Sequence, residues 1–399
     1  MSSPTSSHPG SAPGVPYWRL SSFYLVYFAS LGALVPYWGL YLASLGYGPG
    51  AIGELTAILT GTKVVAPNVW GWIAERRGEP MAVVRLASAL AALSFAGVFL
   101  GSGYAWLALV LTVFSFFWNA VLPQLEATTF SHLREGVHRY THIRVWGSVG
   151  FVLSVAGLGG ALDRHGAGIL PAVVLVLMGG IWVSTLLVPE RTLGHLALTH
   201  EPIGRVLRRR PVIALLTACF LAQMSHGPYY AFFSIHLEAH GYSRAGIGEL
   251  WAIGVSAEVL LFVVMHRLLE RFRLRPMFLA ALALTALRWL LIGLWPERVG
   301  VLVAAQVLHA ASFGVFHAVA VQFVHRFFAG RHHGRGQALY SSTSFGAGGA
   351  LGALLAGYAW DPFGPEVVFL GAAVMAAASF GIVARWLEEP APIPVPAAR

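Results

Sequence analysis

Five ionisable side chains stand inside stretches of sequence that are otherwise apolar: Lys63, Glu258, Arg288, His309 and His317. A charge at the centre of a membrane-spanning helix costs about 2.5–3.5 kcal/mol on insertion scales, so it is normally paired or faces a water-filled cavity. Burial favours the protonated form of a carboxyl group, and imidazole titrates near physiological pH. Groups of this kind can carry a proton, and the two cations can bind an anion.

The two cations and the acid allow more than one arrangement. Lys63 lies near the middle of its apolar stretch, so its side chain cannot easily reach water. It either forms an ion pair between helices or faces a bound ligand. Glu258 either carries a proton or forms a salt bridge with Arg288, and the two roles can coexist. Arg288 stays charged, so it needs an acid or the anionic group of a substrate and is expected to take part in proton coupling.

The two histidines belong to a polar stripe. At about 100° per residue, Gln306, His309, Phe313 and His317 fall within an arc of about 80°. A single histidine there is more often a satisfied core residue, whereas two beside a glutamine favour a proton relay with Glu258. We expect no metal site, because no third ligand has the required spacing.

Lys63 belongs to a second stripe. In one continuous helix, Thr56, Thr60, Lys63, Pro67 and Trp70 share a face. This polar stripe with an aromatic end predicts the wall of a cavity.

Further candidates for substrate binding come from acid–arginine and aromatic patterns. Glu126 and Arg144 end two apolar stretches, and they either reach water at the membrane surface or pair at the mouth of a pathway. Aromatic residues near one membrane face either anchor the interface or stack on a ring-bearing ligand. The predicted substrate-binding residues are Lys63, Arg288, Glu126, Arg144, Tyr37, Trp38, Tyr41, Asn119, Gln306 and Phe313.

A short loop motif, G-W-I-A-E-R-R-G, follows the stretch that contains Lys63. An acid beside arginines at a helix terminus can lock one face of a bundle through charge–dipole contacts. Positive charge on the inner side of a membrane is the plainer interpretation. The predicted cytoplasmic gate comprises Gly71, Glu75, Arg76 and Gly78, with Glu270 and Arg271 as counterparts.

The composition requires a membrane protein. Of the 399 residues 57% are hydrophobic and 11% are charged, whereas a soluble protein carries about 25% charged residues. The single cysteine excludes an internal disulfide and a cysteine-based metal cage. The net charge of +9 is concentrated in short connections on one side, so it indicates membrane orientation and not a nucleic-acid partner.

The apolar stretches predict an all-α membrane protein with twelve spanning helices. Arginine-rich connections place both termini in the cytoplasm. We expect tails at 1–16 and 389–399, six-helix halves at 17–188 and 212–388, and a cytoplasmic linker at 189–211. The spans are expected near 18–45, 51–73, 81–100, 104–126, 144–162, 169–188, 212–238, 246–267, 277–295, 299–325, 336–358 and 366–386.

An internal repeat supports two homologous halves. The 31 residues 46–76 align without a gap on 241–271, at an offset of 195, with 12 identities. In this alignment Lys63 stands opposite Glu258. Two halves of six helices in the same orientation are parallel repeats, which place a substrate site near mid-membrane between them.

These features resemble the major facilitator superfamily over residues 17–388. More narrowly, the segments G-T-K-V-V-A-P-N-V-W-G-W (61–72), G-V-S-A-E-V-L-L-F (254–262), L-R-W-L-L (287–291) and Q-V-L-H-A-A-S-F-G-V-F-H-A (306–318) resemble the phenylpropionate transporter branch. That branch is related to lactose permease and to nucleoside symporters. The comparison with lactose permease implies that Glu258, Arg288 and either His309 or His317 serve in binding and proton coupling. It also implies that Glu126 and Arg144 form a pair. The acid that follows the permease's histidine is absent, which leaves Glu258 itself as a candidate proton carrier.

The predicted function is proton-coupled symport of a small organic solute, with an aromatic carboxylate as the expected class, by alternating access in the inner or plasma membrane. The alternatives are a sugar or nucleoside symporter and a drug exporter. We expect no enzymatic activity and no cofactor, because no nucleophile–base or metal constellation is present. The expected partners are the solute, protons and lipid, and the expected state is a monomer.

Overall fold

The computed structural model describes residues 15–133, 139–190, 203–328 and 332–389, and these are helical almost throughout. Most of the expected tails, and residues 191–202 of the expected linker, lie outside these ranges. The first group of helices is α1 (Tyr17–Ser44), α2 (Pro49–Gly61), η1 (Thr62–Val64), α3 (Ala66–Arg77), α4 (Pro80–Phe95), η2 (Ala96–Leu100), α5 (Tyr104–Leu133), α6 (Tyr140–His165), η4 (Ala167–Ile169) and α7 (Leu170–Leu187). The second is α8 (Gly204–Leu207), α9 (Arg210–Ala239), α10 (Arg244–Arg271), α11 (Leu274–Leu294), α12 (Val299–Val307), η5 (Ala310–Val315), α13 (Phe316–Phe327), α14 (His333–Ser341), η7 (Ser342–Gly348) and α15 (Gly349–Trp386).

The all-α membrane architecture is confirmed, while the count of twelve spans stays a prediction. In the described ranges, nine helical segments are long and apolar enough to cross a membrane. The expected span at 51–73 is broken into α2, η1 and α3. The segment Gly334–Trp386 counts as one candidate, although Gly364 interrupts its helix with φ 82°. This break separates the two spans expected at 336–358 and 366–386.

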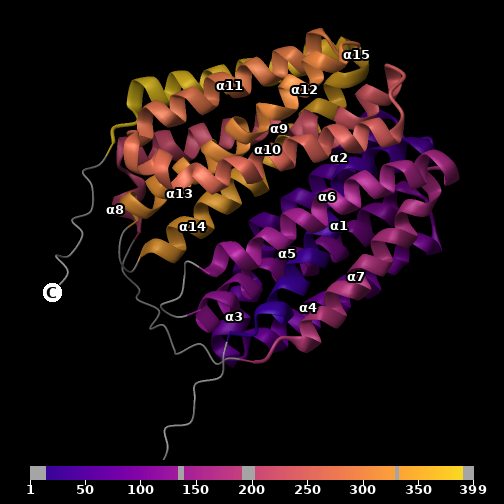
Figure 1. The fold of residues 1–399 in the computed structure, drawn as a ribbon, viewed down its shortest axis with the longest axis horizontal. Helices are drawn as coiled ribbons and strands as arrows, with labels where there is room; N and C mark the ends of the chain where they lie inside the picture. Colours follow the sequence, from indigo (N-terminus) through magenta and orange to yellow (C-terminus); the bar gives the residue numbers. More distant parts are fainter. Residues whose placement is uncertain (1–14, 134–138, 191–202, 329–331, 390–399) are drawn as a thin grey trace, which may run out of the picture.

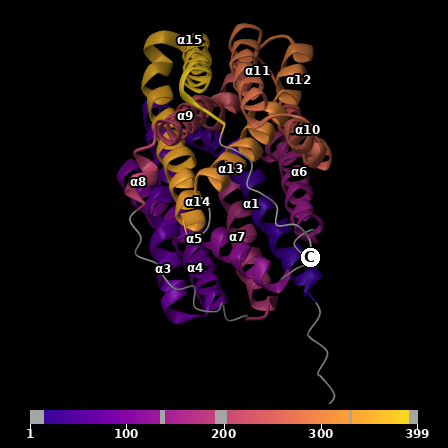
Figure 2. The same cartoon turned by 90° about the vertical axis from the view of Figure 1, so that its left-hand side faces the viewer.

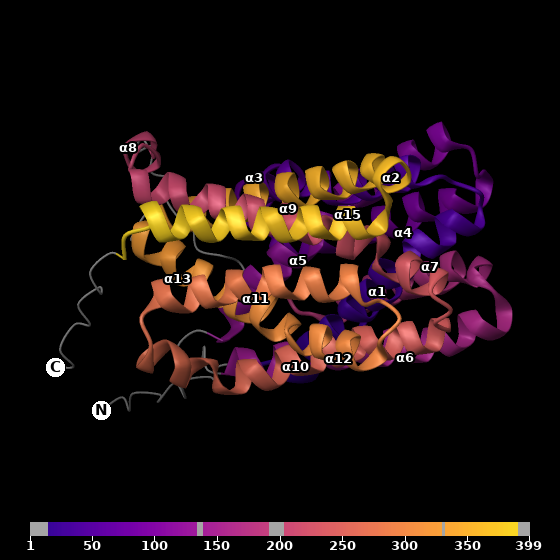
Figure 3. The ribbon, with the colours of Figure 1, turned by 90° about the horizontal axis from the view of Figure 1, so that it is seen from above.

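The helices form two groups that lie against each other. Figure 1 shows α1 to α7 on one side and α9 to α15 on the other, and Figure 2 shows the same division from the end. In the second group, α9, α15 and α11 lie side by side along the bundle, and α12 lies between α11 and α10 (Figure 3). Between the groups, α2 packs against α15 and α6 packs against α10.

The groups meet closely at one end and separate at the other (Figure 1). The closed end is the one at which α1 ends and α10 begins, and the opposite one is the open end. At the closed end both oxygens of Asp163, the last acid of α6, accept backbone N–H bonds at 2.9 Å from Arg244 and Ala245. These donors open α10 and have no partner within the helix, so an acid of one group caps a helix of the other. At the open end a second cavity is lined by Asn68 of α3 and Arg335 of α14.

The repeated glycine of I-G-E-L permits this closure in both halves. A Cβ on Gly53 of α2 would lie 2.8 Å from the Cα of Gly357 in α15. A Cβ on Gly248 of α10 would lie 2.5 Å from the carbonyl oxygen of Val155 in α6. Both contacts are with backbone atoms of the facing helix, which cannot move aside for a larger side chain. The repeat therefore supplies the point at which each inter-group helix pair crosses.

We expect Gly248→Val to separate α10 from α6 at the closed end. Overpacking of this kind costs about 1–3 kcal/mol, so the amides of Arg244 and Ala245 should exchange hydrogen roughly tenfold faster or more. Hydrogen exchange of the peptide containing them measures the change. Gly160→Val is the matched control, because nothing lies within 4 Å of its Cβ position. Unchanged exchange in Gly248→Val would contradict this account of the closure.

Candidate functional site

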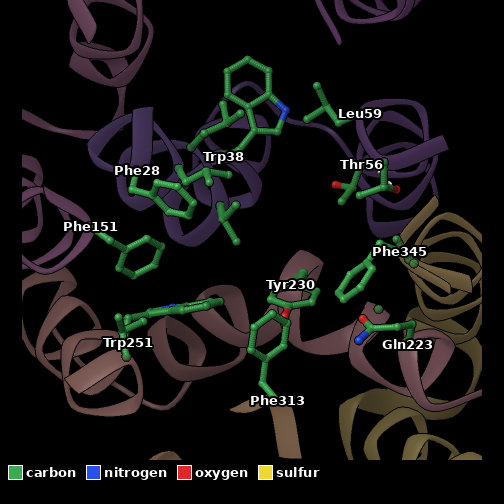
Figure 4. Close-up of a pocket in the computed structure, with 18 of the residues that line it drawn as sticks. Phe28, Trp38, Thr56, Leu59, Phe151, Gln223, Tyr230, Trp251, Phe313 and Phe345 are labelled. Atoms are coloured by element: carbon green, nitrogen blue, oxygen red, sulfur yellow. Dashed lines mark hydrogen bonds between the residues drawn. The ribbon is translucent and has the colours of Figure 1, made fainter. Parts of the chain in front are cut away.

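A cavity of about 310 Å³ lies between the two groups of helices. The first group contributes residues of α1, α2, η1, α5 and α6, and the second contributes residues of α9, α10, η5, η7 and α15 together with His309, which lies between α12 and η5. Figure 4 shows Trp38 and Leu59 on one side of it and Tyr230, Trp251 and Phe313 on the other. Six predicted site residues line the cavity: Trp38, Lys63, Arg144, Glu258, His309 and Phe313.

Lys63 lines the cavity without a partner. In the described part of the chain its ammonium has neither a hydrogen bond nor an ion pair within 4.0 Å, and it does not pair with Glu258. It lies in the 3₁₀ turn η1, where the expected continuous helix breaks. Asn119 of α5 donates to the carbonyl oxygen of Leu59 at 3.1 Å and to the hydroxyl of Thr62 at 2.8 Å. Asn119 therefore holds the backbone around Lys63 and is not itself a cavity residue.

The break changes the predicted stripe. Thr56, Thr60 and Lys63 line the cavity, as the helical spacing predicts. Trp70 does not, because η1 and the new helix start near Pro67 shift the register. The indole of Trp70 packs instead against Phe117, with ring centroids 5.7 Å apart.

Glu258 and His309 form a pair on the cavity wall. Nε2 of His309 lies 3.4 Å from Oε2 of Glu258. Both side chains are largely buried, with 7% of the histidine and 17% of the glutamate side chain exposed. An acid and an imidazole in contact can share a proton, and both remain within reach of a ligand in the cavity.

Arg288 does not line the cavity in this structure and forms no ion pair with Glu258, so its role in substrate binding stays a prediction. Its guanidinium is fully buried behind the wall and donates to the carbonyl oxygen of Ala305 at 3.0 Å and to Ser312 at 3.1 Å. It also donates to Oε1 of Gln306 at 3.2 Å, which places Gln306 in the same network and not at the cavity. The Arg288 network therefore joins the end of α12 to η5 and positions His309, which lies between them.

His317 is separated from the pair. The Phe313 ring stacks on His309 at 5.4 Å and on His317 at 6.0 Å, so it lies between the two imidazoles. Nδ1 of His317 lies 3.0 Å from the hydroxyl of Tyr340, and His317 does not line the cavity. A direct relay between the two histidines is therefore absent.

Glu126 and Arg144 do not form the expected ion pair. Glu126 accepts a hydrogen bond from the Tyr140 hydroxyl at 3.0 Å. The Arg144 guanidinium lies 3.7 Å from the centre of the Phe28 ring and lines the cavity, whereas Glu126 does not. Arg144 is thus a second cation at the cavity, held by a cation–π contact.

Two of the three predicted aromatic residues serve the scaffold. The Tyr37 hydroxyl donates to the carbonyl oxygen of Val155 at 2.7 Å, close to the Gly248 crossing. Tyr41 packs against Trp38 with ring centroids 5.1 Å apart, and so supports Trp38, which lines the cavity.

The predicted gate motif does not bridge the halves. Gly78 ends α3 in the left-handed conformation with φ 70°, and a Cβ on Gly71 would lie 3.3 Å from the amide nitrogen of Gln124. Arg76 lies over Trp72 at 4.0 Å, and Arg271 lies 5.8 Å from the Phe272 ring. Among the described residues, Glu75 and Glu270 have no hydrogen bond or ion pair. Within the ranges that the structure describes, the motif therefore makes none of the ion pairs that such a gate would need.

Several cavity residues were missed by sequence reasoning. The repeat contains a usable signal for two of them: at the offset of 195, Thr56 and Thr60 align with Trp251 and Val255, which also line the cavity. Gln223 lines the cavity too, and its buried Nε2 has no hydrogen-bond partner. No periodic signal identifies the remaining cavity residues, which include Phe28, Trp118, Ser148, Phe151, Tyr230 and Phe345.

Comparison with known proteins gives a consistent family and fold. The model of the MFS_1 like family matches residues 17–371. A probable 3-phenylpropionic acid transporter of Escherichia coli (strain K12) is 30% identical over 369 residues, which cover 90% of this chain and 94% of that protein. The maltose permease of Geobacillus stearothermophilus is 28% identical over 354 residues, covering 87% and 89%. A crystal structure of the nucleoside transporter NupG superposes with a TM-score of 0.79 at 16% identity, covering 92% of this chain and 98% of NupG. A NupG mutant gives a TM-score of 0.83 at 15% identity, covering 92% and 99%.

Proposed function

Because this chain belongs to the MFS_1 like family of membrane transporters, we propose that it is a proton-coupled symporter of a small aromatic carboxylate. The chain is a multi-pass membrane transporter of the major facilitator fold and not an enzyme. The substrate class and the coupling are the proposal. The single observation that carries it is the unpaired ammonium of Lys63 in a cavity with aromatic walls.

The balance of charge supports a monoanion. Lys63, Arg144 and Arg288 lie in or beside the cavity, against the acids Glu126 and Glu258. With both acids ionised, one positive charge is left without a counter-charge. A buried charge is costly until it is paired, so a carboxylate at Lys63 supplies a counter-charge, and the site is neutral while Glu258 is ionised. A sugar or a nucleoside leaves the lysine unpaired, which makes those substrates the less favoured alternatives.

The walls support an aromatic substrate. Trp38, Trp251, Tyr230 and Phe313 surround the space, and aromatic rings prefer offset or edge-to-face contacts with other rings. The relative named for 3-phenylpropionic acid transport agrees with this choice but does not decide it. Glu258, with His309, is the proposed proton site.

Transport is proposed to proceed by alternating access. The closed end is held by contacts between α6 and α10 and between α2 and α15, and the open end leaves the predicted gate motif disengaged. Arginines at the open end, such as Arg76, Arg271 and Arg326, would place that end in the cytoplasm. This structure then represents the inward-facing state, and rocking of the halves about the cavity exposes the other side.

We expect 3-phenylpropionate to drive proton uptake into proteoliposomes that contain the full chain. An internal pH dye reports the initial rate after the acid is added outside. Neutral aryl acids also cross lipid unaided, so protein-free vesicles of the same composition are measured in parallel. The proposal requires a saturable component that the protein-free vesicles lack. If no aryl acid produces it, while a sugar or a nucleoside does, the substrate class is wrong and the fold assignment is unaffected.

A further inference from the structure

The lining of the cavity is sorted by depth. The end of α1 at Ser44 and the start of α10 at Arg244 both lie at the closed end. At 1.5 Å per residue, Trp38 of α1 lies about 9 Å below this end and Trp251 of α10 about 10 Å below it. Lys63 and Glu258 each lie 14 residues into their segments, at a depth of about 21 Å. The closed side of the cavity therefore has an aromatic layer, Trp38 and Trp251, without a charged residue, and the charged layer about 10 Å nearer the open end also contains the rings of Phe28 and Phe313.

The aromatic layer is fixed by its neighbours. Trp38 is 3% exposed and packs on Tyr41 at 5.1 Å and on Phe95 at 6.0 Å. Trp251 is also 3% exposed and lies 4.4 Å from Tyr229. The two indoles come from opposite groups of helices and lie on opposite sides of the space (Figure 4). Side chains packed in this way leave a slot of limited width.

The aromatic layer is unsuited to a carboxylate, because it has no cation and no free N–H donor. Nε1 of Trp251 already donates to Ser234 at 3.1 Å, so it offers nothing to a ligand. A carboxylate placed there would find the hydroxyl of Thr56 but no cation, because Nε1 of Trp38 is fully buried. Lys63 would then face an apolar ring and keep its charge unpaired, which is the costly arrangement.

We propose that the substrate stands with its ring between Trp38 and Trp251 and its carboxylate toward the open end at Lys63. In this pose Trp38 is a specificity-determining residue that limits the size of the ring. The proposal rests on the proposed transport of aryl acids. It adds that substituents on the far side of the ring point toward the closed end, where Trp38 packs on Tyr41 and Phe95. An added methylene in the acid chain points toward the open end and is accommodated.

Displacement of radiolabelled 3-phenylpropionate from the purified full chain tests the orientation. We expect phenylbutyrate, with one more methylene in the chain, to bind within about threefold of the parent acid. A para-tert-butyl group on the ring of phenylpropionate should weaken binding by roughly tenfold or more, because it overpacks the slot. If the para-tert-butyl acid binds the wild-type protein as well as the parent acid does, the proposed orientation is wrong, and no variant is needed to show it.

Variants then assign the size limit to Trp38. Trp38→Ala should reduce the penalty of the para-tert-butyl group to about threefold or less. Trp251→Ala is the second variant, because it enlarges the same slot from the opposite helix. Trp106→Phe is the control, since this tryptophan is 38% exposed and lies outside the cavity, and it should keep the full penalty. A penalty that persists in both alanine variants would overturn the proposal. A different result is that no aryl acid displaces radiolabelled 3-phenylpropionate or drives proton uptake. In that case the proposed function itself is wrong.

Discussion

Glu258→Gln is expected to abolish substrate-driven proton uptake while exchange of labelled 3-phenylpropionate across the membrane continues. Glutamine keeps the size and polarity of the side chain but cannot release a proton. Glu258 is also the one acid on the cavity wall among the described residues, and it is in contact with His309. If one proton moves with each carboxylate, a gradient of about one pH unit supports about tenfold accumulation. The variant should equilibrate its substrate without accumulating it.

The design separates coupling from binding. Exchange in the absence of a gradient reports binding and alternating access, and accumulation against the passive background of protein-free vesicles reports coupling. Glu249→Gln is the matched control, because Glu249 is an exposed acid on the same helix and does not line the cavity. Coupling that survives in Glu258→Gln contradicts the assignment. His309→Gln then becomes the decisive variant, because His309 is the other titratable member of the pair.

The fold was predictable because the features that determine it can be read directly from the amino-acid sequence. Long apolar runs require helices in a membrane, and the repeat at an offset of 195 requires two related halves. The break at η1 was less visible. Pro67 signals a disturbance, but the 3₁₀ turn before it depends on Asn119, which reaches across from α5 to the Leu59 carbonyl and the Thr62 hydroxyl. A contact between two spans cannot be read from the periodicity of either one.

The site was predictable where polarity and symmetry agree. Thr56, Thr60 and Lys63 form a stripe, and at the offset of 195 the repeat places Glu258 on the corresponding face of α10. Arg288 was misplaced because a buried cation has two ways to be satisfied. It can face a ligand, or it can donate to polar groups of its own half, here Ser312, Gln306 and the Ala305 carbonyl. Sequence alone does not show which side of the helix faces the cavity.

The aromatic lining was predictable only in part. Tyr37, Trp38 and Tyr41 are consecutive candidates on one helix, yet they separate into a backbone donor, a cavity wall and a support for that wall. Aromatic rings are common both in cores and at ligand sites, so their type gives little information. Their roles depend on the approach of α10 at Gly248, which is a property of the assembled halves.

Lys63→Gln is expected to weaken binding of 3-phenylpropionate by roughly thirtyfold or more, because removing one member of a desolvated charged pair costs about 2–5 kcal/mol. The sharper result is a loss of discrimination. The wild-type protein should bind the acid much more tightly than the corresponding amide, and Lys63→Gln should bind the two about equally. Competition against radiolabelled phenylpropionate measures both ratios. Because Lys63 is the only lysine in the chain, bound substrate should also protect it from amine-specific acylation, which mass spectrometry can follow in the unaltered protein.

Arg144→Gln distinguishes the two cations of the cavity. Arg144 is held over Phe28 and lies on α6, whereas Lys63 lies on η1 and has no partner. If Lys63 binds the carboxylate, Arg144→Gln should keep the preference for acid over amide, whatever it does to the transport rate. A preference lost in Arg144→Gln and kept in Lys63→Gln would move the carboxylate to the α6 side. The charge balance of the site would be the same with the carboxylate at Arg144. The proposed pose between Trp38 and Trp251 would then be wrong, because the anion would lie beside Glu258 and its proton.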